Sequence, residues 1–268
     1  MPAIFAHDLF GRKVFSELDQ EIKQMIRKEK DCFYLGLQGP DVLFFYRPLA
    51  KNPINQKGYR YHERPAMEIF AHGLQVMRQM EDEKERNAIQ AYLLGMSCHF
   101  ALDHSLHGTV NRLEKETGFT HAQIETELDR RLLQREEMEP VRAYTACHLK
   151  NTEITRLAVM HVLKEEEHAV KEAIFSFKTI TRIFINSGEV FKKLIGVIMK
   201  AAGCHDKYYG MVMKQKPETG LKESTDKLEK QFMETVPFCV RLIEGLYDSM
   251  KKREALPSAF GGNFDGEN

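Results

Sequence analysis

Apolar residues recur at helical spacing along most of the chain. Over residues 9–30 the apolar side chains fall on one face of a helix, which predicts an amphipathic helix. The same spacing predicts helices over residues 65–80, 91–110 and 223–252. Residues 173–202 are more continuously apolar and predict two core helices joined at residues 186–188. Because no stretch alternates apolar and polar residues long enough for a central sheet, we predict an all-α fold, a single-domain multi-helix bundle.

Breaks between the predicted helices are expected where glycine, proline or charged residues interrupt the apolar pattern. A turn is expected at Gly39-Pro40-Asp41, a polar loop over residues 51–61 and a charged connection over residues 81–87. Gly118 is expected to end the helix of residues 91–110 and its continuation. The pattern predicts one helical domain over residues 1–256. Residues 257–268 contain three glycines and are predicted to form a flexible C-terminal tail.

Composition narrows the class of protein. Hydrophobic residues make up 43% and charged residues 29%, a balance typical of globular proteins. Lys+Arg and Asp+Glu both number 39, so net charge gives no reason to expect a nucleic-acid partner. We see no secretory signal and no apolar run long enough to span a bilayer, which predicts a cytoplasmic protein. Five scattered cysteines without a CxxC pair are expected to be buried thiols of a reducing compartment.

The helix predicted over residues 91–110 carries His99, Asp103 and His107 at successive spacings of four. A step of four turns a helix by about 400°, so the three side chains form one stripe about 12 Å long. Ala88, Tyr92 and Met96 would continue that line, and the stripe therefore belongs to a face that is otherwise apolar. Buried imidazoles and carboxylates need partners, and a divalent metal would satisfy all three.

Further ligand-type residues surround this helix in the sequence. Thr120 and Gln123 form a capping box, and the helix that they open places His121 and Glu125 four residues apart on one face. Asp41 stands in an apolar turn, where it would otherwise cap the next helix. His62 precedes one predicted helix and His7 lies just before or in the first turn of another. Clustered histidines and carboxylates without nearby cysteines favour zinc in a hydrolytic site over a structural zinc finger.

In this order, the residues resemble the zinc-dependent phospholipase C family, whose all-helical fold is shared with the S1/P1 nucleases. The resemblance rests on His7, on the LGLQGPD segment ending in Asp41, on His62, on the HxxxD of His99 and Asp103 with His107, and on the HxxxE of His121 and Glu125. The motifs cover about residues 1–130. The ordered set is more specific than any pair within it.

The resemblance implies a set of zinc ligands. It places Asp41, His62, His99 and Asp103 around one zinc ion, with His107, His121 and Glu125 around a second. Asp103 would bridge to a third site that includes His7, and Asp41 would orient or deprotonate the attacking water.

Three departures from the family pattern leave alternatives open. Secreted members complete the third site with a processed N-terminal Trp, and this chain has no Trp. His104 is a rival to His107, although it lies about 100° further round the helix, off the stripe. His72 is a rival to His62.

The resemblance implies a metal-dependent hydrolase that cleaves phosphate esters, a phospholipase C-type phosphodiesterase with a phospholipid as substrate. Apolar residues around 208–213 would receive acyl chains. The first alternative is a single-strand nuclease or a hydrolase of a small phosphate ester. The second is a non-catalytic helical protein with a degenerate site. The oligomeric state is open.

Overall fold

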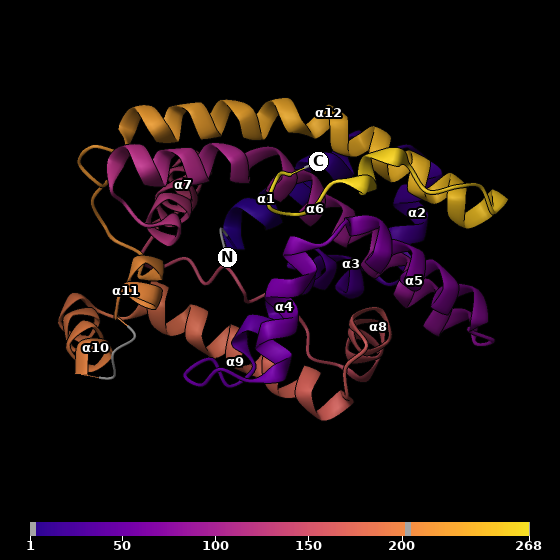
Figure 1. Ribbon diagram of the computed structural model, residues 1–268, viewed down its shortest axis with the longest axis horizontal. Coiled ribbons are helices and arrows are strands. Elements are labelled where there is room, and N and C mark those ends of the chain that lie inside the picture. Colours follow the sequence, from indigo (N-terminus) through magenta and orange to yellow (C-terminus); the bar gives the residue numbers. More distant parts are fainter. Residues whose placement is uncertain (1–3, 202–204, 268) are drawn as a thin grey trace.

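The computed structural model describes residues 4–201 and 205–267, which are helical with no strand among them (Figure 1). The α-helices of this part of the chain are α1 (Ile4–Glu17), α2 (Gln20–Lys28), α3 (Lys30–Gly36), α4 (Pro53–Glu63), α5 (Ala66–Gln79), α6 (Glu83–Thr117), α7 (His121–Arg135), α8 (Glu153–Leu163), α9 (Glu167–Asn186), α10 (Glu189–Ala201), α11 (His205–Tyr208) and α12 (Lys222–Lys252). Short 3-10 helices are η1 (Gly39–Phe45), η2 (Tyr209–Met211) and η3 (Ser258–Gly261). The predicted all-α fold is confirmed.

Helix α6 is the central element, and α1, α3, α5, α7, α8 and α12 pack against it. The helix spans 35 residues because Asp82 caps its first turn, accepting a hydrogen bond from the backbone N–H of Glu85. The charged connection predicted over residues 81–87 is therefore wrong, since most of it forms the start of α6. Gly118 ends the helix at φ +75°, as predicted.

Two glycines bring α3 into close contact with α6. A Cβ atom added to Gly36 would lie 2.3 Å from the carbonyl oxygen of Tyr92, and one added to Gly95 would lie 2.1 Å from that of Phe33. Only hydrogen side chains allow the two backbones to pack at this separation. The close packing brings Leu37, just after α3, beside α6.

Side-chain caps divide segments that the apolar pattern leaves undivided. Residues 9–30 are not one helix, because Asp19 accepts a hydrogen bond from the backbone N–H of Ile22 and starts α2. Residues 51–61 are not a loop, because Asn52 and Asn55 form a capping box with Pro53 in the first turn of α4.

The C-terminal segment is packed against the core, which corrects the prediction of a flexible tail. Phe260 and Phe264 are both fully buried. Phe260 stacks on Phe70, with ring centroids 4.0 Å apart. The carbonyl of Gly262 accepts a hydrogen bond from the backbone N–H of Ala66 at the start of α5. The glycines of this segment permit its turns, and the two aromatic rings hold it in place.

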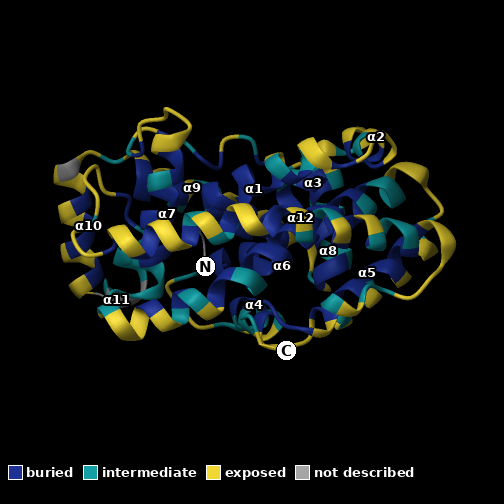
Figure 2. Ribbon diagram, turned by 90° about the horizontal axis from the view of Figure 1, so that it is seen from above, coloured by how far each residue is buried: buried dark blue, intermediate teal, exposed yellow. Residues whose placement is uncertain are grey.

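The apolar stretch 173–202 forms two helices, α9 and α10, joined where predicted, but α10 is not a core helix. Figure 2 shows exposed positions along α10, whereas residues 91–103 in the middle of α6 are all buried. The described part of the chain has no helix that combines the length and the apolar character required to cross a membrane.

The cysteines also differ in part from the prediction. Cys32, Cys98 and Cys239 are free and buried, whereas Cys147 is free and exposed. Cys204 lies outside the described residues.

Candidate metal centre

The structure brings together the eight ligand-type side chains that the sequence singles out. They come from five elements: His7 from α1, Asp41 from η1, His62 from α4, His99, Asp103 and His107 from α6, and His121 and Glu125 from α7. Seven of them are buried, and His121 is partly exposed. We call this set the histidine cluster.

Asp103 lies at the centre of the histidine cluster. Its Oδ1 atom is 3.2 Å from Nε2 of His7 and 3.5 Å from Nε2 of His107. Its Oδ2 atom is 3.1 Å from Nε2 of His99 and 3.7 Å from Nε2 of His62. One carboxylate therefore contacts four imidazoles and links the two ends of the cluster.

Two further carboxylates lie on either side of Asp103. Asp41 Oδ1 is 2.9 Å from Nε2 of His62 and 3.8 Å from Nε2 of His99. At the other end, Glu125 Oε1 is 3.1 Å from Nε2 of His121 and 3.4 Å from Nε2 of His107. The helical spacing of four seen in the sequence thus places each HxxxD or HxxxE pair in direct contact.

Gly39 allows η1 to approach α6 closely enough to place Asp41 beside His99. Its φ of +50° is a conformation that favours glycine, and an added Cβ would lie 2.3 Å from the His99 ring. A side chain at this position would displace either the turn or the imidazole. The Gly-Pro-Asp turn predicted from the sequence therefore positions both a carboxylate and a histidine.

Backbone carbonyls fix the orientation of two imidazoles. His99 Nδ1 lies 3.2 Å from the carbonyl oxygen of Leu37, and His62 Nδ1 lies 2.9 Å from that of Gly58. Because a carbonyl only accepts, each Nδ1 carries the hydrogen. When these rings are neutral, their Nε2 lone pairs point at the carboxylates. His99 Nε2 is buried and makes no hydrogen bond in the described part of the chain. A cation is needed between these atoms.

The pKa values show how protons supply that positive charge in the metal-free protein. Burial lowers the pKa of His62, but Asp103 and Asp41 outweigh it and raise this pKa to about 9. Burial likewise opposes protonation of His107, and Asp103, Asp265 and Glu125 raise its pKa to about 10.

The pKa values of the three carboxylates in the cluster shift in the opposite direction, downward. Burial favours the neutral acid of Asp41, but surrounding positive charge, including that of His99 and His62, lowers its pKa to about 2. The pKa of Asp103 is held well below its usual value, because His99, His107 and His7 outweigh its burial. All three carboxylates, Glu125 included, are thus ionised near neutral pH.

The donor set fits zinc. Imidazole nitrogen and carboxylate oxygen are zinc ligands, and tetrahedral coordination at bond lengths near 2.0–2.1 Å places ligand atoms about 3.3 Å apart. The nitrogen–oxygen separations in the cluster, 2.9–3.8 Å, bracket that value. Three groups have ligand atoms within 4.8 Å of one another: His7, His99 and Asp103; Asp41, His62 and His99; and His107, His121 and Glu125.

Neither rival histidine lies in the cluster. His72 Nε2 donates a hydrogen bond to the carbonyl oxygen of His161, at 2.9 Å. His104 Nδ1 donates to the carbonyl oxygen of Asn263, at 2.8 Å, and its ring stacks on Phe100.

Three residues near the site were not singled out from the sequence. Asp265 Oδ1 lies 3.5 Å from Nδ1 of His107, the side of the ring away from Asp103. Phe264 packs against the rings of His62 and His99. Asp129 is buried and accepts hydrogen bonds from the backbone N–H groups of Phe5 and Ala6, which anchors the start of α1 and so His7. Spacing gave no signal for Asp265 or Phe264, because both follow a glycine-rich stretch far from the cluster in sequence.

Comparison with known proteins provides independent support. A family model described as zinc-dependent phospholipase C matches residues 6–178, a range that contains all eight residues of the histidine cluster. No curated protein and no solved structure matches the chain significantly. The match covers more than half of the chain, and the chain belongs to the zinc-dependent phospholipase C family.

Proposed function

We propose that this protein is a zinc-dependent phosphodiesterase of the phospholipase C type, which cleaves the phosphodiester bond of a phospholipid. One observation carries the proposal. Five histidines and three ionised carboxylates from five separate elements converge at metal-ligand spacing, inside the region that matches the family. A structural role would not require buried charges, because an apolar core stabilises a helical bundle without them.

We assign the ligands according to the contacts. Asp41, His62, His99 and Asp103 would hold one zinc ion, and His107, His121 and Glu125 a second. A third ion at His7 and Asp103 is the alternative to a simple imidazole–carboxylate contact there. Zinc, when bound, supplies Lewis acidity toward the phosphate and a nucleophilic water near neutral pH.

Asp41 is the proposed catalytic residue among the chain's own groups. Its pKa of about 2 in the metal-free protein makes its carboxylate a weak base that stays ionised. Such a group is better suited to accepting a hydrogen bond from the attacking water, and so orienting it, than to removing its proton. The contact with His62 at 2.9 Å fixes the carboxylate in position for this role.

A phospholipid is favoured over a polynucleotide by an apolar cavity next to the cluster. Phe44, three residues after Asp41 on η1, packs its ring 5.3 Å from that of His62 and also lines the cavity. Tyr208 and Met211, within the stretch expected to receive acyl chains, line the same cavity. A single-strand nuclease or a small phosphate-ester hydrolase is the alternative on the same site.

The test is metal content per chain together with turnover of three substrates assayed side by side. These are a phospholipid in mixed micelles, a soluble chromogenic phosphodiester and single-stranded DNA. We expect two zinc ions per chain, or three, and hydrolysis of the phospholipid that is lost with a chelator and restored by zinc. One metal ion or none in a stably folded protein would overturn the proposal, and turnover of DNA alone would select the nuclease.

Asp41→Asn sharpens this test. Loss of the orienting carboxylate is expected to lower turnover by about 10²–10⁴-fold, while the zinc at His107, His121 and Glu125 is retained. Asp248→Asn, on an exposed face of α12, is the matched control and should leave both turnover and zinc content unchanged.

A further inference from the structure

Helix α10 presents an apolar face to solvent. The exposed fractions of its outer side chains are 84% for Val190, 47% for Phe191, 50% for Leu194, 64% for Val197 and 56% for Ile198. At 100° per residue these five side chains cover one continuous face of about 120°. Single exposed apolar residues are ordinary, but a contiguous apolar helix face marks an interaction surface.

The other sides of α10 explain how it is held. Ile195 and Met199 are buried in a small apolar cluster with Phe184 and Val212, separate from the main core. Lys192 is also buried, and its Nζ donates a hydrogen bond to the carbonyl oxygen of Met213, at 2.7 Å. The inner face therefore fixes the helix to α9 and to the segment after α11, which leaves the outer apolar face available.

Basic residues flank the outer face. Lys193 and Lys200 are exposed and lie next to Val197 on the helix surface, with spacings of four and three residues. An apolar face with lysines at its edge is typical of a helix that lies in the plane of an anionic membrane interface. At 13 residues α10 is about 20 Å long, too short to cross a hydrocarbon core of about 30 Å.

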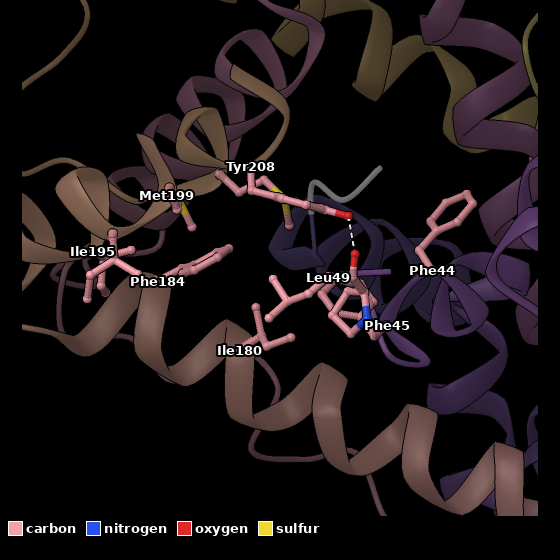
Figure 3. Close-up of a pocket in the computed structure, with 11 residues that line it drawn as sticks. Phe44, Phe45, Leu49, Ile180, Phe184, Ile195, Met199 and Tyr208 are labelled. Carbon is pink, nitrogen blue, oxygen red and sulfur yellow. Dashed lines mark hydrogen bonds between the residues drawn. The ribbon is translucent and has the colours of Figure 1, made fainter. Parts of the chain in front are cut away.

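Behind α10 lies an apolar cavity of about 390 Å³ (Figure 3). Its walls include Phe44, Phe45 and Leu49 on one side and Phe184, Ile195 and Met199 on the other. Tyr208 connects the two sides by donating a hydrogen bond to the carbonyl oxygen of Pro48, at 2.6 Å. Leu49 lines the cavity and is 85% exposed, so it also reaches solvent.

We infer that the outer face of α10 docks on an anionic phospholipid surface. Val190, Phe191, Leu194, Val197 and Ile198 enter the interfacial layer, and Lys193 and Lys200 meet the lipid headgroups. Two observations select lipid over a second copy of the chain. The lysines complement anionic headgroups, and the helix forms one wall of an apolar cavity whose lining residue Phe44 also packs against His62 of the histidine cluster. The inference goes beyond the proposed reaction, because docking is a property of α10 whichever phosphoester is cleaved.

Flotation of the zinc-supplemented full chain with vesicles tests this docking without an activity readout. One set of vesicles contains phosphatidylcholine alone and the other equal parts of phosphatidylcholine and phosphatidylglycerol. We expect binding to the anionic vesicles that weakens as salt is raised. Lys193→Gln and Lys200→Gln are each expected to reduce the partition coefficient about fivefold.

Leu194→Gln combined with Val197→Gln removes part of the apolar face and is expected to reduce partitioning at least about tenfold. Met233→Gln is the matched control, since Met233 is 49% exposed on α12 and should leave partitioning unchanged. Circular dichroism confirms that each variant is folded.

Three results would overturn the inference. The first is that neither kind of vesicle binds the protein, and the second is binding that Met233→Gln reduces as much as the α10 variants do. The third is concentration-dependent dimerisation that the α10 double variant abolishes, which would assign the face to a second copy. Hydrolysis of the soluble phosphodiester is measured in parallel. If hydrolysis persists without vesicle binding, only the docking fails; if binding occurs without any hydrolysis, only the proposed function fails.

Discussion

The histidine cluster and helix α10 depart from the usual distribution of polar and apolar residues in opposite ways. In the cluster, three carboxylates and five imidazoles lie almost entirely away from solvent. In α10, five large apolar side chains lie in solvent. Each departure is unfavourable in the isolated protein, because buried charge loses hydration and exposed apolar surface orders water.

In each region a binding partner is expected to offset this unfavourable free energy. Without metal, protons would supply the positive charge that the cluster requires, in keeping with the raised pKa values of His62 and His107, and metal ions would replace these protons. Among the described residues none covers the outer face of α10, and the proposed partner of this face is a phospholipid surface. The following predictions test that contrast, from the largest expected effect to the smallest.

Asp103→Ala is expected to reduce hydrolysis by more than about 10³-fold, since it removes the carboxylate that contacts four imidazoles and should empty the proposed zinc site that Asp103 shares with Asp41, His62 and His99. Elemental analysis and turnover of the soluble phosphodiester measure the effect. Vesicle binding should persist, because Asp103 is buried on α6 and is not part of the outer face of α10. A variant that keeps its full zinc content would contradict the central role of Asp103.

Removal of zinc should make the cluster sensitive to pH. The pKa values of His62 and His107 are about 9 and about 10, above the ordinary value, so their protonation stabilises the fold fully below about pH 6.5. That stabilisation is lost as pH rises through 9 and 10. Zinc must displace these protons, and its affinity should rise up to about tenfold per pH unit for each histidine.

Urea denaturation of the chelator-treated protein across this pH window checks the first part, and zinc titration at the same pH values checks the second. Stability of the zinc-free protein that increases toward pH 10 would contradict the assignment. The zinc-loaded protein serves as the control.

Asp265→Asn is expected to weaken zinc binding about 10- to 100-fold. Its carboxylate faces Nδ1 of His107, and such outer contacts fix the orientation and basicity of a histidine ligand. Competition with a zinc chelator measures the affinity. Asp248→Asn is again the control, and equal affinity for zinc in Asp265→Asn and wild type would show that Asp265 has no such role.

Gly39→Ala is expected to lower the free energy of unfolding by about 1–3 kcal/mol, since the residue has a positive φ and a Cβ would meet the His99 ring. Urea denaturation measures it. Gly188→Ala, where an added Cβ meets nothing within 4 Å, should change stability by less than about 0.5 kcal/mol. Equal losses of stability in the two variants would refute the close approach of Gly39 to the His99 ring.

Leu194→Gln should have the smallest effect, less than about 0.5 kcal/mol on unfolding, because this side chain already contacts solvent. Its neighbour Ile195 is buried on the inner face of α10, and Ile195→Ala should lower the free energy of unfolding by about 2 kcal/mol or more. Thermal unfolding compares the pair. A large loss in Leu194→Gln would mean that the outer face belongs to the core.

The sequence by itself determined the all-α class, most helix positions and the candidate members of the histidine cluster, with His72 and His104 left as rivals to His62 and His107. These features depend on local spacing. Apolar periodicity marks a helix face, and a spacing of four places His99, Asp103 and His107, or His121 and Glu125, on one side of one helix. The ordered set of motifs also carried the family resemblance that the family model confirms.

Tertiary structure decided what depends on long-range contacts. The caps at Asp19 and Asn52 divide helices through individual hydrogen bonds that periodicity does not reveal. Asp265 reaches His107 only because Phe260 and Phe264 anchor a segment that reads as a loose tail. An apolar run in a sequence indicates burial but not its partner, so only the packed structure shows that α9 buries its apolar face while α10 leaves much of its own exposed to solvent.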